Sequence, residues 1–270
     1  MTVPWAAASV AALLVGGYAV AVRGRPASLP AWDGRRTAAW VTGALLVAVA
    51  LCPPVAAGAQ HDHRLHMVQH LLLGMYAPLG LVLGAPLTLL LGTLPRPLAR
   101  RSVHVLRSAP VHVLAHPVVA AVLSTGGLFA LYLTPLYGWT REHGVVHALV
   151  LTHLLLAGCL LTWSVAGPDP APRRPGTATR LAVLVASAGA HAFLAKLLYA
   201  RASEGTGHEH HGAAHVASAA TELAQEAAVW MYYGGDGAEL LLAVILLAAW
   251  YRRGAPRASG AAAPSDGLRC

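Results

Sequence analysis

Histidine is the residue type in this sequence with the clearest chemical potential, and three histidines share a helical spacing. His63, His66 and His70 stand at i, i+3 and i+7, so a helix would place their rings on one face. Met67 and Gln69 lie among them, and an apolar run follows. Neutral imidazole binds copper, zinc, iron and nickel, and thioethers suit Cu(I). The pattern predicts a metal-binding face centred on His66 and His70.

The composition of the chain indicates a membrane protein. Of 270 residues, 56% are hydrophobic and only 11% are charged, and the mean hydropathy is +0.56. Soluble domains carry about 25% charged residues. Several apolar stretches reach the about 20 residues that a helix needs to cross a bilayer. Because the alternating pattern of barrel strands is absent, the predicted fold is all-α: a polytopic membrane helix bundle.

Breaks at Pro, Gly and Arg divide the chain into seven predicted transmembrane helices. They form one domain, 1–253, with helices at about 5–22, 37–56, 64–91, 112–133, 143–166, 178–200 and 222–251. The first is expected to be retained, since no basic segment precedes it as in a signal peptide. The basic connector 95–110 suits an interfacial helix. Residues 254–270 are predicted to be a disordered cytoplasmic tail.

The basic residues predict the orientation. With seven helices, 15 of the 19 Lys and Arg residues fall on the side of the C-terminal tail, and the other side holds Arg64, Arg141, Lys196 and Arg201. The positive-inside rule then places the N-terminus outside and the C-terminus in the cytoplasm. Because these arginines lie in short loops without interleaved aromatics, no nucleic-acid partner is expected.

This topology places twelve of the fifteen histidines outside or within the membrane. His147 joins the outer group, whereas His153 and His191 lie near mid-membrane. We expect four polar side chains to hold imidazole N–H groups by hydrogen bonds: Gln69, Glu222, Gln225 and Glu226.

Simpler interpretations stand beside these candidates. His153 and His191 could each satisfy one interhelical hydrogen bond. The loop histidines between 208 and 215 could be solvated and bind metal weakly. His116, which precedes a proline, more plausibly begins a helix. Three distant cysteines form no CxxC pair, so neither a disulfide framework nor a thiol metal shuttle is expected.

Four blocks of the sequence resemble the CtaG-type cytochrome c oxidase assembly factors, over roughly 40–253. The most specific block is His66-Met67-Val68-Gln69-His70, which runs on to Gly84-Ala85-Pro86. The others are 116–137, which includes Tyr132 and Tyr137, 147–170, which closes on Gly-Pro-Asp-Pro, and 191–193. The last helix departs from the pattern, since Ala224-Gln225 stands where the family usually has Asp-Gln.

The resemblance implies a non-enzymatic, multi-pass protein of the bacterial plasma membrane that supports oxidase maturation through copper supply. We expect His66, His70 and His147 to bind copper. Further or relay ligands would be His63, His153, His191 and Met67. The expected partners are cytochrome c oxidase subunits, extracytoplasmic copper chaperones and membrane lipid.

Three other functions stay open from the sequence. A haem-binding electron-transfer protein could take two axial imidazoles from His70 with His153 or His191. A metal-ion permease is less favoured, because only His153 and His191 continue inward. A metal-free structural scaffold for the oxidase would use none of the histidines as ligands.

Overall fold

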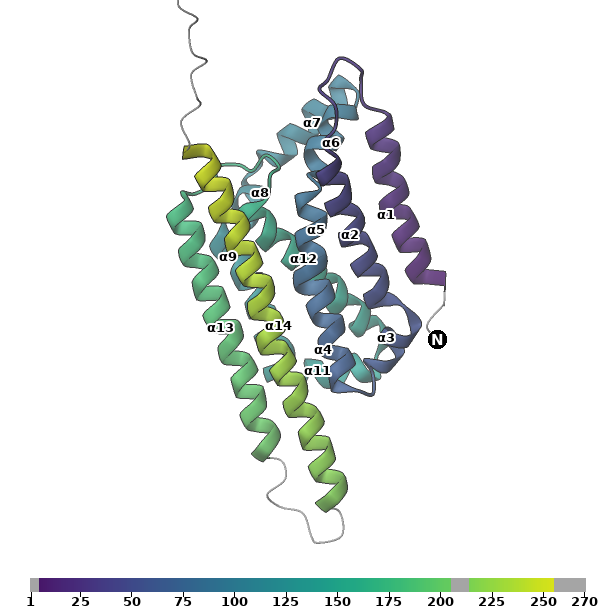
Figure 1. Cartoon of the computed structure of the whole chain (residues 1–270), viewed down its shortest axis with the longest axis vertical. Helices are drawn as coiled ribbons and strands as arrows, with labels where there is room; N and C mark the ends of the chain where they lie inside the picture. The colour runs from purple at the N-terminus through teal and green to yellow at the C-terminus, as the bar shows by residue number, and fades with distance from the viewer. Residues whose placement is uncertain (1–4, 205–213, 255–270) are drawn as a thin grey trace, which may run out of the picture.

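The computed structural model describes residues 5–204 and 214–254, with side chains described for 7–203 and 221–253. Every regular element in those ranges is a helix, which confirms the all-α class. Figure 1 shows the long helices side by side along the long axis of the molecule. The tail 255–270 and His208, His210 and His211 lie outside the described residues, as does the side chain of His215.

In the first half of the chain, the helices differ from their predicted bounds where a proline or a π-helical turn interrupts them. Pro53 and Pro54 end the second helix early, because proline cannot donate the N–H that would continue it. The predicted helix 64–91 is divided by a π-turn and by a break at Ala85, which has a left-handed φ of 52°. The elements are α1 (Trp5–Arg23), α2 (Gly34–Leu51), α3 (Pro53–Gly58), α4 (His63–Leu71), η1 (Leu72–Tyr76), α5 (Ala77–Leu83), α6 (Pro86–Thr93), α7 (Arg96–Leu106) and α8 (Ala109–Leu114).

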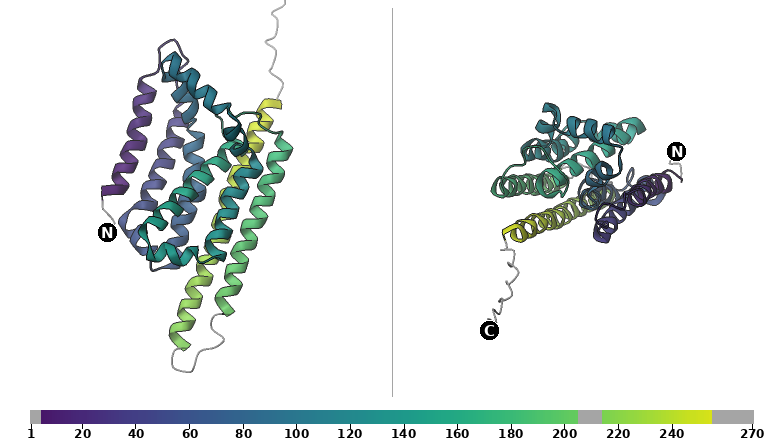
Figure 2. Two further views of the ribbon diagram at one scale, coloured as in Figure 1. Left: turned by 180° about the vertical axis from the view of Figure 1, so that it is seen from behind. Right: turned by 90° about the horizontal axis from the view of Figure 1, so that it is seen from above.

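The second half begins at His116, whose Nδ1 accepts a hydrogen bond from the Val118 N–H at 3.3 Å and caps the next helix. The predicted helix 112–133 therefore starts only at Pro117. Its elements are α9 (Pro117–Ala121), η2 (Val122–Gly126), α10 (Gly127–Leu133), α11 (Leu136–Glu142), α12 (Gly144–Ala166), α13 (Thr177–Glu204) and α14 (Ala214–Gly254). In Figures 1 and 2, α13 and α14 extend past α3 and α11 at one end.

Length and composition support fewer membrane spans than the seven expected. In the described part of the chain, four segments qualify: His63–Thr93, Gly144–Ala166, Thr177–Ser203 and Thr221–Arg253. A fifth is obtained if Pro117–Leu133 and Leu136–Glu142, which meet at 77°, count as one broken span. The apolar part of α1 is shorter, and α2 begins with Gly34-Arg35-Arg36, which makes its mean composition less apolar.

Small residues allow the helices around the His66–His70 segment to approach closely. A Cβ at Gly43 on α2 would lie 2.6 Å from the backbone nitrogen of Leu81 on α5. A Cβ at Gly158 on α12 would overlap the carbonyl oxygen of Gly74 on η1. On the other side, α14 packs against α4 and α13. The α4–η1–α5 segment is thus enclosed by α2, α12 and α14, which fixes the direction of its side chains.

Asp169 ties the α12–α13 connection to the start of α6. Its carboxylate, 3% exposed, accepts hydrogen bonds from the backbone N–H groups of Leu87 at 3.0 Å and Thr88 at 2.8 Å. Arg174 braces the same loop by donating to the carbonyl oxygens of Gly167 at 2.7 Å and Asp169 at 2.9 Å. The Gly-Pro-Asp-Pro segment is therefore a structural clamp, and it lies away from the histidines of α4.

The two ends of the bundle carry different side chains. Figure 1 shows α7, α8 and the α1–α2 connection at one end, together with the C-terminal end of α14. This end holds most of the arginines, including those of α7 (Arg96–Leu106). The start of α4, α3 and α11 lie at the opposite end. The histidines of α4 thus descend into the bundle from the arginine-poor end.

Candidate functional site

His66 is the centre of a group at the arginine-poor end. Its ring is 8% exposed, and its Nε2 lies 3.1 Å from the hydroxyl of Tyr132 on α10. The same hydroxyl donates to Met67 Sδ at 3.9 Å. Tyr132 contacts only the Nε2 of His66, and which of the two groups donates depends on the tautomer of the imidazole. The contact therefore leaves one ring nitrogen able to bind a metal.

Two further histidines and a second tyrosine complete what we term the rim group: His63, His66, His147, Tyr132 and Tyr137. The Tyr137 ring packs edge-on against His66 with centroids 5.0 Å apart and lies 6.3 Å from His63. His63 is exposed and His147, on α12, is half-buried. Helices α4, α10, α11 and α12 thus bring the rim group together.

His70 and His191 form a second pair deeper in the bundle. They are 2% and 1% exposed, and their rings meet edge-on with centroids 6.2 Å apart. His70 Nδ1 and both ring nitrogens of His191 have no hydrogen-bond partner among the described residues. Glycine makes this burial possible, since a Cβ at Gly235 would overlap the His191 ring. Buried polar atoms are nearly always paired, so three unpaired imidazole nitrogens indicate a place for a ligand.

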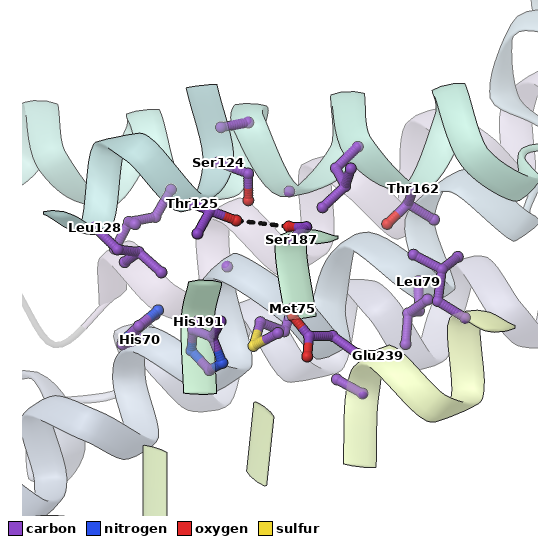
Figure 3. Close-up of a pocket in the computed structure, with 17 residues that line it drawn as sticks. His70, Met75, Leu79, Ser124, Thr125, Leu128, Thr162, Ser187, His191 and Glu239 are labelled. Carbon is purple, nitrogen blue, oxygen red and sulfur yellow. Dashed lines mark hydrogen bonds between the residues drawn. The ribbon is translucent and has the colours of Figure 1, made fainter. Parts of the chain in front are cut away.

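A small cavity lies beside this pair. It has a volume of about 40 Å³, enough for two or three water-sized occupants. Figure 3 shows His70, His191, Met75 and Glu239 around it, with the hydrogen bond of 2.6 Å between Thr125 and Ser187 on one wall. Glu239 is not among the candidate site residues predicted from the sequence, although an acidic residue within an apolar helix is itself a functional signal.

The structure leaves His153 out of this arrangement. His153 is exposed, and its Nε2 lies 3.0 Å from the carbonyl oxygen of Leu123, which it can only approach as a donor. This contact corresponds to the simpler interpretation, one interhelical hydrogen bond.

The four side chains expected to orient imidazoles have other surroundings. The Gln69 amide donates to the carbonyl oxygen of Ala50 at 2.8 Å, and Glu226 pairs with Arg64 at 3.4 Å. Glu222 is exposed and Gln225 is half-buried. No hydrogen bond joins any of the four to an imidazole within the described side chains.

Few potential metal ligands meet at any one point of the site. Across residues 7–203 and 221–253, no three side chains of His, Cys, Asp or Glu converge closely enough to hold a metal ion together. What the bundle provides instead is a series of imidazoles from the rim inward, with the thioethers of Met67 and Met75 beside them. Such a series can bind and exchange a soft cation at low coordination number, rather than enclose it permanently.

Comparison with known proteins identifies relatives of this chain. An uncharacterized protein of Mycobacterium bovis, Mb0105, is 34% identical over 169 residues, which are 60% of this chain and 26% of that protein. An uncharacterized protein of Mycobacterium leprae, ML1998, is 31% identical over 172 residues, again 60% and 26% of the two chains. This chain thus spans about a quarter of the length of these curated relatives. No solved structure gives a significant match.

A family profile gives the broader assignment. The profile of the cytochrome c oxidase caa3 assembly factors (Caa3_CtaG) matches residues 16–253, which include every element of the site described above. The chain therefore belongs to the cytochrome c oxidase caa3 assembly factor family.

Proposed function

We propose that this protein takes up copper at the outer face of a bacterial plasma membrane and supports its delivery to cytochrome c oxidase during assembly. The observation that carries the proposal is the His70–His191 pair, buried with three unpaired ring nitrogens directly inward of the rim group. Copper is the cargo in this account, and the protein acts as an assembly factor without catalysing a reaction.

The ligand types favour Cu(I) over zinc. Structural zinc sites are closed and four-coordinate, with ligands that converge on one point. The described residues offer instead imidazole nitrogens in ones and twos with thioether sulfur near them, a donor set that suits Cu(I). The proposed ligands are therefore His66, His70, His147 and His191, with His63 and Met67 at the entrance.

Haem is the weaker alternative. Pockets that enclose drug-sized ligands occupy roughly 300–1,000 Å³. The cavity beside His70 and His191 measures about 40 Å³, so a haem there would require the helices to separate. His153 faces away from this pair, which removes the other axial combination considered from the sequence.

The proposed topology keeps seven spans, with α1 and α2 as part of the membrane bundle. Tyr18 on α1 donates to the carbonyl oxygen of Gly84 at 2.7 Å, and Trp40 on α2 donates to that of Leu14 at 2.9 Å. The first bond joins α1 to the α5–α6 segment, and the second joins α2 to α1. The positive-inside rule then puts the arginine-rich end in the cytoplasm and the rim group outside, where it would meet copper chaperones and oxidase subunits.

Metal analysis of the full chain in detergent tests the proposal. The double variant His66→Ala with His70→Ala is compared with His104→Ala, an exposed histidine of α7 at the arginine-rich end. We expect the double variant to bind less copper than wild type and to fail in oxidase maturation, while His104→Ala matches wild type in both. Unchanged copper content and maturation in the double variant would refute the proposal.

A further inference from the structure

Glu239 on α14 is a buried acidic residue without a compensating partner. It is 7% exposed, and its Oε2 has no hydrogen-bond partner among the side chains and backbone that the structure describes. The ion pairs found among the described side chains are those of Arg64 with Asp62 and with Glu226, at the end of the bundle. A carboxylate buried without a cation is destabilising, so such a group either keeps its proton or takes a positively charged partner. A cation bound beside Glu239 would supply that partner.

The side chain lines the same cavity as two softer donors. Figure 3 shows the Met75 sulfur, the His191 ring and the Glu239 carboxylate directed toward a common space. They come from η1, α13 and α14 respectively, so three separate segments supply the donors. The cavity of about 40 Å³ has room for an ion together with one or two waters.

The two π-helical turns found in the described residues, η1 and η2, both border this cavity. η1 contributes Gly74 and Met75, and η2 contributes Ser124 and Thr125. A π-turn shifts the register of the side chains that follow it and occurs frequently at functional sites. Its presence on two neighbouring segments at one cavity is independent of the Glu239 observation and points to the same place.

We propose that Glu239, Met75 and His191 form an inner binding site for a Cu(I) ion, reached from the rim group through His70. This inference rests on the proposed function and adds a second copper-binding site within the bundle. A monovalent cation in a low-dielectric interior needs an adjacent negative charge. One carboxylate and one Cu(I) ion are together neutral, whereas thioether and imidazole alone would leave the ion's charge uncompensated. The oxidation state of copper does not change at this step.

The order of the groups gives the cation a route inward. The exposed His63 and half-buried His147 stand at the entrance beside His66. His70 and His191 follow at 6.2 Å between ring centroids, and His191 borders the cavity of Glu239. The Cu(I) ion would pass from one imidazole to the next, and the carboxylate of Glu239 is the last donor that it reaches.

Anaerobic Cu(I) titration of the full chain against a chromophoric chelator tests the inner site. We expect the wild type to bind two ions, Glu239→Gln to bind one, and Glu142→Gln, an exposed carboxylate on α11, to bind two. The triple variant His63→Ala, His66→Ala and His147→Ala should lose the rim ion and keep the inner one when loaded to equilibrium. Glu239→Gln with two ions would overturn the inner site and leave the rim proposal standing. A wild type that binds no copper would overturn both.

A second variant tests the inner site if Glu239→Gln does not fold. Met75→Leu nearly conserves side-chain volume and removes the inner thioether. We expect Met75→Leu to weaken the binding of the inner Cu(I) ion at least tenfold. It should also reduce the sulfur scattering of that ion in the copper X-ray absorption spectrum. Met67→Leu is the matched control, and it should affect the rim ion alone. Equal effects of the two variants on the inner ion, or none from Met75→Leu, would contradict the assignment.

Discussion

His66 Nε2 lies 3.1 Å from the hydroxyl of Tyr132, and this hydroxyl donates onward to Met67 Sδ at 3.9 Å. One side chain from α10 thereby contacts both a ring nitrogen of His66 and a neighbouring thioether. Partners of metal-binding histidines commonly act in this way, by fixing the tautomer and the ring orientation.

Tyr132→Phe tests that relationship. Removal of the hydroxyl takes away the hydrogen-bond partner of His66 Nε2 and with it a restraint on the ring orientation. We expect the Cu(I) affinity of the rim group to fall by roughly 10-fold to 100-fold. Chelator competition measures the change, with Tyr233→Phe, a 70% exposed tyrosine of α14, as the control. An affinity equal to that of wild type would show that Tyr132 does not position His66.

Gly235→Ala tests the contact between α14 and the deeper histidine pair. A Cβ there would overlap the His191 ring, so the ring or the helix must shift. Overpacking of this kind typically costs about 1–3 kcal/mol of unfolding free energy. Gly189→Ala on α13 is the matched control, because nothing lies within 4 Å of its Cβ position. Unfolding in detergent should give a lower midpoint for Gly235→Ala than for wild type and an unchanged midpoint for Gly189→Ala. Equal midpoints for all three proteins would contradict the packing described.

Asp169→Asn tests the clamp between the α12–α13 connection and α6. The buried carboxylate accepts two backbone N–H groups, and hydrogen bonds to charged groups contribute about 1.5–3 kcal/mol each. We expect a lower unfolding midpoint with copper stoichiometry unchanged, since the clamp lies away from the histidines. Loss of bound copper from a folded Asp169→Asn protein would be inconsistent with a purely structural role.

Asp62, at the start of α4, gives a prediction for pH. Hydrogen bonds from Arg64 hold the pKa of the Asp62 carboxyl below its usual value of 3.8. Because the folded pKa is lowered, its contribution to stability is present above the unfolded pKa and is lost as pH falls through the folded pKa. Unfolding midpoints measured from neutral to acid pH should therefore converge for wild type and Asp62→Asn at the acid end. A constant difference between them over the whole range would argue against this contribution.

The common direction of the α4 histidines follows from sequence spacing, and the separation of the α12 histidines has the same geometric cause. His66 and His70 are one helical turn apart, so both project into the bundle from α4. His147 and His153 are six residues apart on α12, and a helix turns about 600° over that interval, which directs them to different faces. The observed contact of His153 with Leu123 agrees with this.

Other features depend on contacts between distant segments. Tyr132 reaches His66 only because α10 packs beside α4, a contact across 66 residues of sequence. Met75 and Thr125 enter one cavity because π-turns shift them, and hydrophobic periodicity gives no sign of such turns. Gln69 has the spacing of a residue beside the histidines, yet it is directed to Ala50 because α2 ends there.

The central claim is that the buried pair of His70 and His191 binds copper. The most direct measurement is the copper content of the purified full chain after anaerobic Cu(I) loading, for wild type, for His70→Ala with His191→Ala, and for His104→Ala. The account predicts that the double variant loses at least one bound ion per chain, while His104→Ala matches wild type. Equal copper content in all three proteins would contradict it.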